Sequence, residues 1–422
     1  MDMNKTVPLP RDLQFPRIRP VEAVPVEHQG EQLICLRDPQ RIAQNALVIH
    51  PVLFFLLTRL DGKHSLLDLQ VEVQRKFNQL IPRQNLEDMI RQLDRECYLE
   101  SETYYQILQK MEEDFKNSPV RAAAFAGQAY ENDPERLRHQ LQTCQASMMA
   151  EAPADLFDRK TRSVRALISP HIDLHRGGKC FAYAYQEIAI REPSDLYLIF
   201  GTGHQIRNSM MVLTKKAFDT PLGPVETDQV FAHTLLQESP LDLFAEEILH
   251  KNEHSIEFQV LWLKYILGDS WKGKIVPILS GSLHPFIQQG VSPRTDSQLA
   301  QTLDIIRRMI REYSGKVTVI AGADMSHVGK RFGSPLGIPP TELKRVEQDD
   351  LEVIRAIRSG NAEQFFNTIE KNRDCNNVCG LSPVYMTLDV TQPAAGTLLK
   401  YEQAIEADTE SVVTYASISF CE

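Results

Sequence analysis

The sequence predicts an α/β protein in which a mainly parallel sheet is flanked by helices, with a small helical domain before it. From about residue 160 onward, short and strongly apolar runs alternate with helical stretches, which is the pattern of βαβ units. Before that point, apolar residues recur at helical spacing between separate turn and cap signals. At about 100–200 residues per domain, a chain of 422 residues also has room for two domains or three.

The N-terminal part predicts an extended arm followed by a small domain. Residues 1–24 are rich in proline and show little apolar periodicity, so we expect an arm there. Residues 25–118 form the expected domain. An apolar run at 50–57 leads into an Asp-Gly turn, after which Ser65 stands where a helix N-cap belongs. A further helix follows with Asn85 as its expected cap, and a short strand is expected at Tyr98-Leu99.

This N-terminal pattern is typical of a winged-helix-like domain. With its Leu-Asp-Gly turn and preceding LICLRDP strand, it also resembles PqqD-like peptide-recognition domains. Acidic residues are mixed among its basic residues, which favours a protein-docking module over a DNA-binding one. The whole chain has a net charge of −10 and lacks a Lys/Arg-rich stripe, so nucleic acid is not expected as a partner.

The apolar segments predict a cytoplasmic protein that does not enter the membrane. No run reaches the ~18 apolar residues of a membrane span, and the N-terminus lacks the apolar core of a signal peptide. The seven cysteines include no CxxC pair, which argues against a disulfide framework and against a four-cysteine zinc knuckle.

The predicted sheet brings histidines to its strand ends. Buried strands are expected at 164–168, 196–200, 275–279 and 317–321, and the C-terminal SVVTYASISF predicts one more. The first, second and fourth of these runs lead into His171, His204 and His327. Ligands of open α/β sheets bind outside the carboxyl ends of the strands, so these side chains can converge. The glycines in the same motifs would allow sharp turns and close backbone approach.

Each histidine alone is most simply a hydrogen-bonded structural residue, but three at equivalent strand ends favour a metal site. Glu253, His254 and Glu257 open an amphipathic helix nearby; for Glu257, complementing the helix dipole is as good an explanation as a functional role. Pro170 and a Gly-Gly pair predict that no helix forms around His175. A full GxGxxG is absent, so a nucleotide site is not expected.

Six motifs in order resemble those of the Memo family, which includes the AmmeMemoRadiSam system protein B group. They are SPHIDLHRGG, FGTGHQ, TPLG, NEHSIEFQ, GADMSH and NVCGLSP. Upstream, FAGQAY followed by DPERLRHQL resembles the usual opening of the family, which places a Memo-like α/β domain at residues 119–422.

The resemblance implies a fold similar to class III extradiol dioxygenases and a redox metal held by His171, His204 and Cys379. Asp324 and His327 would line the same pocket, with His327 as general acid/base and Asp324 orienting it.

Two further residues are expected beside the cofactor. His254 would lie near the ion, and Asp173 stands next to the first ligand motif, where many members of the family have Ala-Gly in place of Ile172-Asp173. This extra carboxylate would alter the charge balance or the room for substrate.

The expected activity is redox or oxygen-dependent chemistry on an unidentified small-molecule or peptide substrate, with Fe(II) or copper. A thiolate ligand is softer than the carboxylate of extradiol enzymes and shifts preference toward copper, zinc or thiolate-tolerant iron. One alternative is a non-catalytic peptide- or protein-binding module, working with the radical-SAM and AMMECR-type proteins that the group's name implies. Another is a zinc hydrolase with Glu257 or Asp324 as the base.

Overall fold

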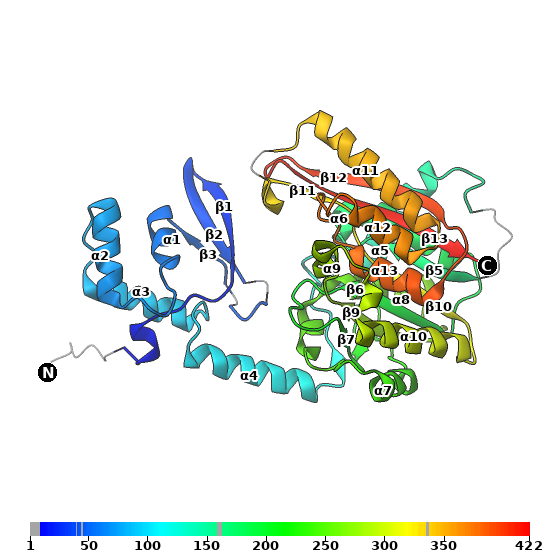
Figure 1. The fold of residues 1–422 in the computed structure, drawn as a ribbon, viewed down its shortest axis with the longest axis horizontal. Coiled ribbons are helices and arrows are strands. Elements are labelled where there is room, and N and C mark those ends of the chain that lie inside the picture. Colours follow the sequence, from blue (N-terminus) through cyan, green and yellow to red (C-terminus); the bar gives the residue numbers. More distant parts are fainter. Residues whose placement is uncertain (1–8, 39, 44, 158–162, 335–336) are drawn as a thin grey trace. The chain divides into compact units, whose positions relative to one another are not determined.

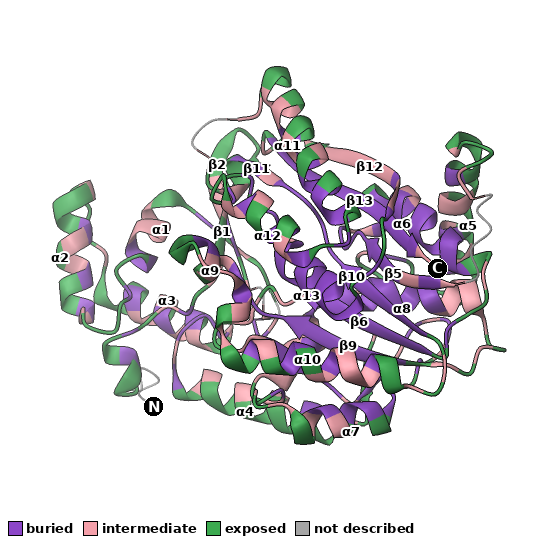
Figure 2. Cartoon of the chain, turned by 45° about the vertical axis from the view of Figure 1, so that its right-hand side comes forward, coloured by how far each residue is buried: buried purple, intermediate pink, exposed green. Residues whose placement is uncertain are grey.

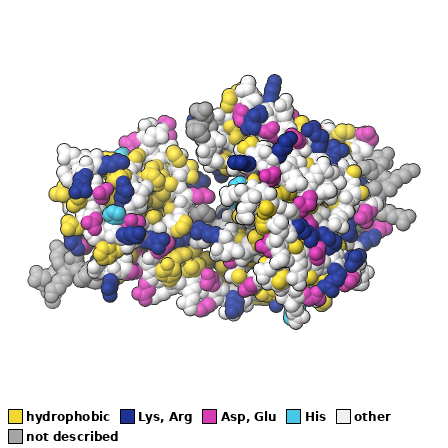
Figure 3. Space-filling model, viewed as in Figure 1, with side chains coloured by type: hydrophobic (Ala, Val, Ile, Leu, Met, Phe, Trp, Pro, Cys, Tyr) yellow, Lys and Arg dark blue, Asp and Glu magenta, His cyan; other side chains and the backbone are white. Residues whose placement is uncertain are grey.

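The computed structural model describes residues 9–38, 40–43, 45–157, 163–334 and 337–422, and its chain divides into two units, residues 1–117 and 118–422 (Figure 1). On the face seen in Figure 3, basic and acidic side chains are interspersed over both units. Among the described residues, no helix combines the length and the apolar character needed to cross a membrane.

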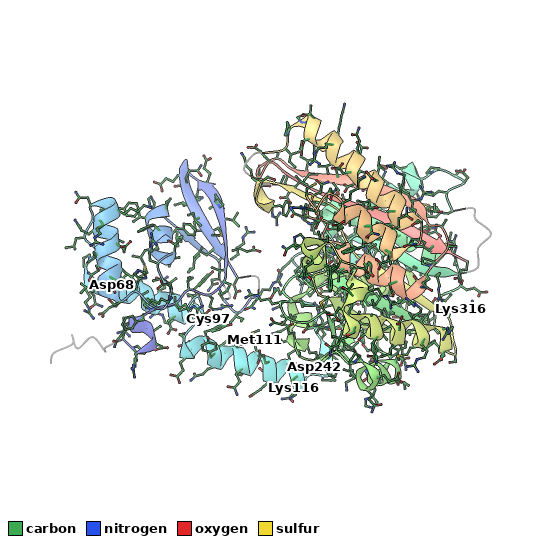
Figure 4. All side chains as sticks on the ribbon, viewed as in Figure 1. Asp68, Cys97, Met111, Lys116, Asp242 and Lys316 are labelled. Atoms are coloured by element: carbon green, nitrogen blue, oxygen red, sulfur yellow. The ribbon has the colours of Figure 1, made fainter. Side chains whose placement is uncertain are left out.

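The N-terminal unit has a three-stranded antiparallel sheet followed by four helices. The sheet is β1 (Glu22–His28), β2 (Glu31–Arg37) and β3 (Leu47–Ile49), and the helices are α1 (Pro51–Leu57), α2 (Leu66–Phe77), α3 (Arg83–Arg95) and α4 (Glu102–Asn117). The predicted cap of α2 is confirmed. The Ser65 hydroxyl accepts the N–H of Asp68 at 3.3 Å, and the Asp68 carboxylate accepts the N–H of Ser65 at 2.9 Å; Asp68 is labelled in Figure 4.

Three expectations for the N-terminal unit need correction. The described part of the expected arm is not free, because Leu9 and Leu13 are buried in the core of this unit; residues 1–8 lie outside the described residues. Asn85 is not the cap of α3. This helix begins at Arg83, and its first turn is closed by the N–H of Leu86 donating to the carbonyl of Pro82 at 3.2 Å. The strand expected at Tyr98-Leu99 is reduced to one isolated bridge to residue 18.

The C-terminal unit is built on an eight-stranded sheet with the order β11-β13-β5-β10-β6-β9-β7, and β12 also pairs with β13. The four predicted strands form its parallel centre: β5 (Val164–Ser169), β10 (Val317–Gly322), β6 (Leu196–Thr202) and β9 (Lys274–Ser280). The outer strands all pair antiparallel: β7 (Met211–Leu213), β11 (His327–Gly329), β12 (Thr397–Glu406) and β13 (Ser411–Cys421). The sheet is therefore mixed, and the prediction of a mainly parallel sheet holds only for its centre.

Helices cover both faces of this sheet. One face packs against α5 (Pro134–Glu151), α6 (Leu174–Ala189) and α8 (His254–Leu267), and the other against α7 (Gln229–Glu238), α10 (Ser297–Glu312), α11 (Pro340–Arg358), α12 (Ala362–Glu370) and α13 (Leu381–Thr391). The short α9 (His284–Gln289) follows β9, and β4 (Val120–Arg121) pairs with β8 (Ala217–Phe218). Along β6, Leu198 faces one core and Ile199 the other, as the alternation of a strand requires. Figure 2 shows the central strands and α13 almost wholly buried.

The register of the parallel strands decides where the histidine motifs meet. Ser169 of β5 pairs with Gly322 of β10, and Gly322 pairs with Gly201 of β6, so three strand ends are level with one another. At the opposite end of β10, the N–H of Lys316 (labelled in Figure 4) donates to the Asp195 carboxylate at 2.8 Å. The chain segments that follow Ser169, Gly201 and Gly322 consequently leave the sheet side by side.

Candidate metal centre

His171, His204 and Cys379 lie together at the carboxyl ends of the parallel strands. Their donor atoms all fall within 4.8 Å of one another. The Cys379 sulfur is 3.3 Å from Nε2 of His171 and 3.4 Å from Nε2 of His204. Metal bonds of about 2.0–2.3 Å place neighbouring ligand atoms roughly 3.1–3.6 Å apart, so these separations suit a single ion.

The imidazole of His171 is held by backbone on the side away from the sulfur. Its Nδ1–H donates to the carbonyl of Gly322 at 2.9 Å, which leaves Nε2 facing Cys379. The carboxylate of Asp324 accepts the N–H of His171 at 2.9 Å and that of Ile172 at 3.2 Å. Such contacts set the ring orientation and the tautomer that a metal ligand needs.

His204 is held by a carboxylate instead. Its Nδ1 lies 3.0 Å from Oε2 of Glu253, and its backbone N–H donates to the same oxygen at 3.1 Å. Glu253 is the N-cap of α8, and its other oxygen accepts the N–H groups of His254 and Ser255 at 2.8 and 3.0 Å. The side chain of His204 is 36% exposed, so solvent or a substrate can reach this side of the cluster.

Cys379 comes from a tightly turned loop before α13. Arg373, Asp374 and Asn377 in this loop all have positive φ angles near 50°, a region that costs energy for residues with a side chain. The Asp374 carboxylate holds the turn by accepting the N–H of Val378 at 2.7 Å. Because Cys379 directly precedes Gly380, the N-cap of α13, the positive end of the helix dipole also favours its thiolate form.

The charges of the cluster support one another. Burial works against the charged form of His171, yet Asp324 and Cys379 raise its pKa to about 9. Burial also opposes the charged form of His204, but Glu253 and Cys379 raise its pKa well above the usual value. Burial would raise the pKa of Cys379, and the two imidazoles outweigh it and lower that pKa well below the usual value. Each imidazole thus favours the thiolate form of Cys379, and the thiolate favours the protonated form of each imidazole.

Glycine is required at the strand ends because the α8 N-terminus packs directly on them. A Cβ on Gly322 would lie 2.3 Å from the carbonyl oxygen of Ser255, and one on Gly201 would lie 2.5 Å from the Ser255 hydroxyl. Neither glycine has a positive φ angle. Space for α8 rather than backbone conformation therefore demands glycine at these two positions, and the expected close approach of backbone to a ligand stays a prediction.

His254 joins the cluster as a third imidazole. Its ring centre lies 5.3 Å from that of His171 and 4.9 Å from that of His204. With His204 and Glu253 it forms a second set of close donor atoms. However, the His204 and His254 rings are stacked with only 15° between their planes, and lone pairs in stacked planes cannot meet at one ion. The His171 and His204 planes cross at 72°, which permits convergence.

His327 lies in β11, and backbone rather than Asp324 orients it. Its Nδ1–H donates to the carbonyl of Met325 at 3.2 Å, and its N–H donates to that of Asn376 at 2.8 Å. The carboxylate of Asp324 instead accepts the backbone N–H of His171. The expectation that Asp324 orients His327 is therefore wrong, while Nε2 of His327 keeps a lone pair that can accept a proton.

Comparison with known proteins identifies the family of the chain. The family described as Memo-like protein matches residues 121–419. The chain belongs to this family. This Memo-like chain is similar to a MEMO1 family protein of Aquifex aeolicus, with 27% identity over 394 residues. The match covers 93% of this chain and 96% of the relative. MEMO1 family proteins of Sulfurisphaera tokodaii and Saccharolobus solfataricus are 30% and 28% identical over 309 residues, covering 71% of this chain and 99% of each relative.

These coverages separate two kinds of relative. A match to 93% of the chain leaves too few residues for the N-terminal unit to lie outside it, so the Aquifex aeolicus protein is similar to most of both units. The proteins of Saccharolobus solfataricus and Sulfurisphaera tokodaii instead match a share of this chain close to that of the Memo region alone.

The structure does not bring Glu257 of this Memo-like protein to the cluster. Its carboxylate is 1% exposed and forms an ion pair with the fully buried Arg121. It also accepts the hydroxyl of Tyr130 at 2.5 Å and the N–H of Phe125 at 2.9 Å. These contacts anchor the 120–130 segment to α8. Glu253, one turn earlier, is the carboxylate that contacts His204. Its place at the N-cap of α8 is the sequence signal that could have identified it.

Asp173 also has a local role. It is the N-cap of α6, where its side chain accepts the N–H groups of His175 and Arg176 at 3.1 and 3.2 Å and binds the Arg176 side chain at 2.6 Å. The expectation that no helix surrounds His175 is wrong, because α6 begins at Leu174. Its Gly177 and Gly178 are buried where a Cβ would collide with Ile172 and Cys144, respectively.

Proposed function

We propose that this Memo-like protein binds one redox-active metal ion, Fe(II) or copper, through His171, His204 and Cys379, and uses it in oxygen-dependent chemistry on an unidentified substrate. The observation that carries the proposal is the convergence of the three donor atoms within 4.8 Å, while the other ring nitrogen of each histidine is held by protein. A metal ligand needs its ring orientation fixed in this way before the ion binds, whereas a purely structural histidine does not.

The donor set favours a reactive site over a structural one. Structural zinc sites are closed by four protein ligands, whereas catalytic sites keep positions open. Among the described residues, only three side chains share this centre within ligand distance. The thiolate favours copper, zinc or thiolate-tolerant iron. A redox metal bound here would supply one-electron chemistry with oxygen or substrate.

The chain's own groups would divide the remaining work. The free Nε2 of His327 suits it to accept or donate a proton, since Nδ1–H is committed to the Met325 carbonyl. Asp324 fixes His171, and Glu253 fixes His204. The partly exposed face of His204 offers the side from which a substrate would approach.

The test is the metal content of the full-length protein purified without oxygen. Near-stoichiometric iron or copper is expected, and it should be lost in His171→Ala and His204→Ala while folding is retained, because neither strand-end ligand lies in the apolar core. Cys379→Ser should weaken binding and favour harder ions. Cys375→Ser is the matched control, since Cys375 is exposed on the same loop and should leave binding unchanged. Stoichiometric zinc would favour a hydrolase instead, and a protein that binds no metal would favour a non-catalytic binding role.

A further inference from the structure

Asp350 is a buried carboxylate that none of the groups above contacts. It lies on α11, is 0% exposed, and accepts three hydroxyl groups: that of Ser326 at 2.5 Å, Thr414 at 2.6 Å and Tyr401 at 2.8 Å. Within the described part of the chain, no Lys, Arg or His side chain lies within ion-pair distance of it. Burial raises the pKa of Asp350, and the three hydroxyl hydrogen bonds offset this only in part.

Burying a carboxylate without a cation is unfavourable, and an apolar side chain of similar volume would often stabilise the fold more. The carboxylate instead fixes the positions of the chain segments that donate to it. A hydroxyl hydrogen rotates to suit its partner, so one acceptor that receives three of them fixes the segments that carry them. These segments are the loop after β10 and the two consecutive strands β12 and β13, so the carboxylate joins the loop to a distant part of the chain.

The loop after β10 is clamped most strongly. The N–H of Ser326 donates to the Thr414 hydroxyl oxygen at 2.9 Å, and the N–H of Thr414 donates to the carbonyl of Ser326 at 2.9 Å. The N–H of Met325 donates to the Thr414 carbonyl at 2.8 Å. Asp350 accepts hydrogen bonds from the hydroxyls of both Ser326 and Thr414, so it holds residues 324–327 against β13.

Residues 324–327 in turn contact the loops of two proposed ligands. The Asp324 carboxylate holds the N–H of His171 at 2.9 Å. On the other side, the Met325 carbonyl accepts the N–H of Cys379 at 3.1 Å, and the Asp324 carbonyl accepts the N–H of Gly380 at 2.8 Å. A shift of this segment would therefore move both the imidazole and the thiol.

We propose that Asp350 is a positioning residue of the metal centre: by fixing residues 324–327, it holds His171 and Cys379 at ligand separation before an ion binds. The inference rests on the proposed metal site. Asp350 touches neither the ligands nor the space between them, so its effect passes through Ser326 and Thr414.

The test uses the full chain and Co²⁺ as a spectroscopic probe, because bound Co²⁺ shows a thiolate charge-transfer band that depends on the geometry of the ligands. In Asp350→Asn, an amide that carries its own donors replaces an oxygen that accepts hydroxyls. We expect about tenfold weaker Co²⁺ binding, as for other supporting groups, and an altered thiolate band. Asp389→Asn is the control, because Asp389 is a buried carboxylate that pairs with Arg294 and Arg307 and belongs to the other end of α13. It should lower stability while leaving the band unchanged.

A second pair of variants guards against a general folding effect. Thr414→Val removes one donor to Asp350 and the acceptor of the Ser326 N–H, so it should reproduce the loss, whereas Thr414→Ser keeps the hydroxyl and should retain wild-type binding. If Asp350→Asn and Thr414→Val lower the thermal midpoint but leave Co²⁺ affinity and the band unchanged, Asp350 is only structural and the proposal is overturned.

A metal-free measurement separates this inference from the proposed function. If the wild-type protein gave no thiolate band, the metal site itself would be refuted, and the alkylation rate of Cys379 relative to Cys375 would decide the role of Asp350. Cys375 is exposed and serves as the internal reference. A several-fold change of this ratio in Asp350→Asn supports the positioning role, and an unchanged ratio contradicts it.

Discussion

Glu253 and His204 form a carboxylate–imidazole pair in which one helix cap also orients a proposed metal ligand. Oε2 of Glu253 lies 3.0 Å from Nδ1 of His204, while Oε1 caps α8 through the N–H groups of His254 and Ser255. The position of the imidazole is thus tied to the beginning of a buried helix rather than to a mobile loop.

Glu253→Gln should weaken metal binding by about 10–100-fold. The amide can still cap α8, but it no longer offers a negative charge to the His204 ring. The free energy of unfolding should fall by only about 1 kcal/mol, as for the loss of a helix cap. Competition with a chromophoric chelator measures the affinity, and thermal unfolding measures the stability. Affinity equal to that of the wild type would show that this pair does not support the site.

Glu257→Gln should have the opposite profile, with a large loss of stability and no change in metal affinity. The substitution leaves the fully buried guanidinium of Arg121 without its carboxylate, and breaking such a pair costs about 3–5 kcal/mol. Urea unfolding checks the first part, and metal titration of the folded protein checks the second. If binding were lost in a protein that remains folded, Glu257 would have to act in the site after all.

Metal affinity should rise with pH from below neutrality to at least about 9. An ion binds only the deprotonated ligands, so protons on His171 and His204 compete with it, whereas Cys379 already favours the thiolate. Because the pKa of His171 is raised to about 9 and that of His204 is also raised, binding at neutral pH should release up to two protons. Calorimetry in buffers of different ionisation enthalpy counts them. An affinity that stays flat between about pH 6 and pH 8 would indicate neutral imidazoles before binding.

The fragment of residues 1–117 should fold without the rest of the chain, because its helices and sheet share a core of their own, which includes Leu36, Leu69 and Ile90. Circular dichroism and amide dispersion in NMR spectra test this expectation. Ser65→Ala should lower the free energy of unfolding of the fragment by about 1 kcal/mol through loss of the cap of α2. Aggregation of the fragment would mean that the two units depend on a common core.

The parallel centre of the sheet could be predicted because its strands are continuous apolar runs that are buried on both faces. The outer strands could not be assigned from pattern alone. In β13, Ser411–Phe420 are all buried, so the alternation of Val, Thr and Ala does not mark an exposed face. Its antiparallel pairing with β5 depends on where the chain returns, which local sequence does not specify.

The local role of single residues was harder to predict. The Gly177-Gly178 pair predicted a break, yet it lies inside α6 because only glycine fits between that helix and its neighbours. Glu253 and Glu257 lie one turn apart, and the sequence around them does not show which one faces the site. Only the tertiary structure shows that Glu257 pairs with Arg121, whereas Glu253 contacts His204.

The sequence by itself determined that this protein has a Memo-like α/β domain and that His171 and His204 each follow a buried strand, because apolar runs and strand-end motifs are local signals. Only the tertiary structure decided that the sulfur of Cys379, some 175 residues after His204, lies 3.4 Å from Nε2 of that histidine and that Asp350 accepts the hydroxyl of Ser326 in the loop after β10. Those contacts arise from strand register and helix packing. They depend on distances between residues that are remote along the chain, and no local pattern encodes these distances.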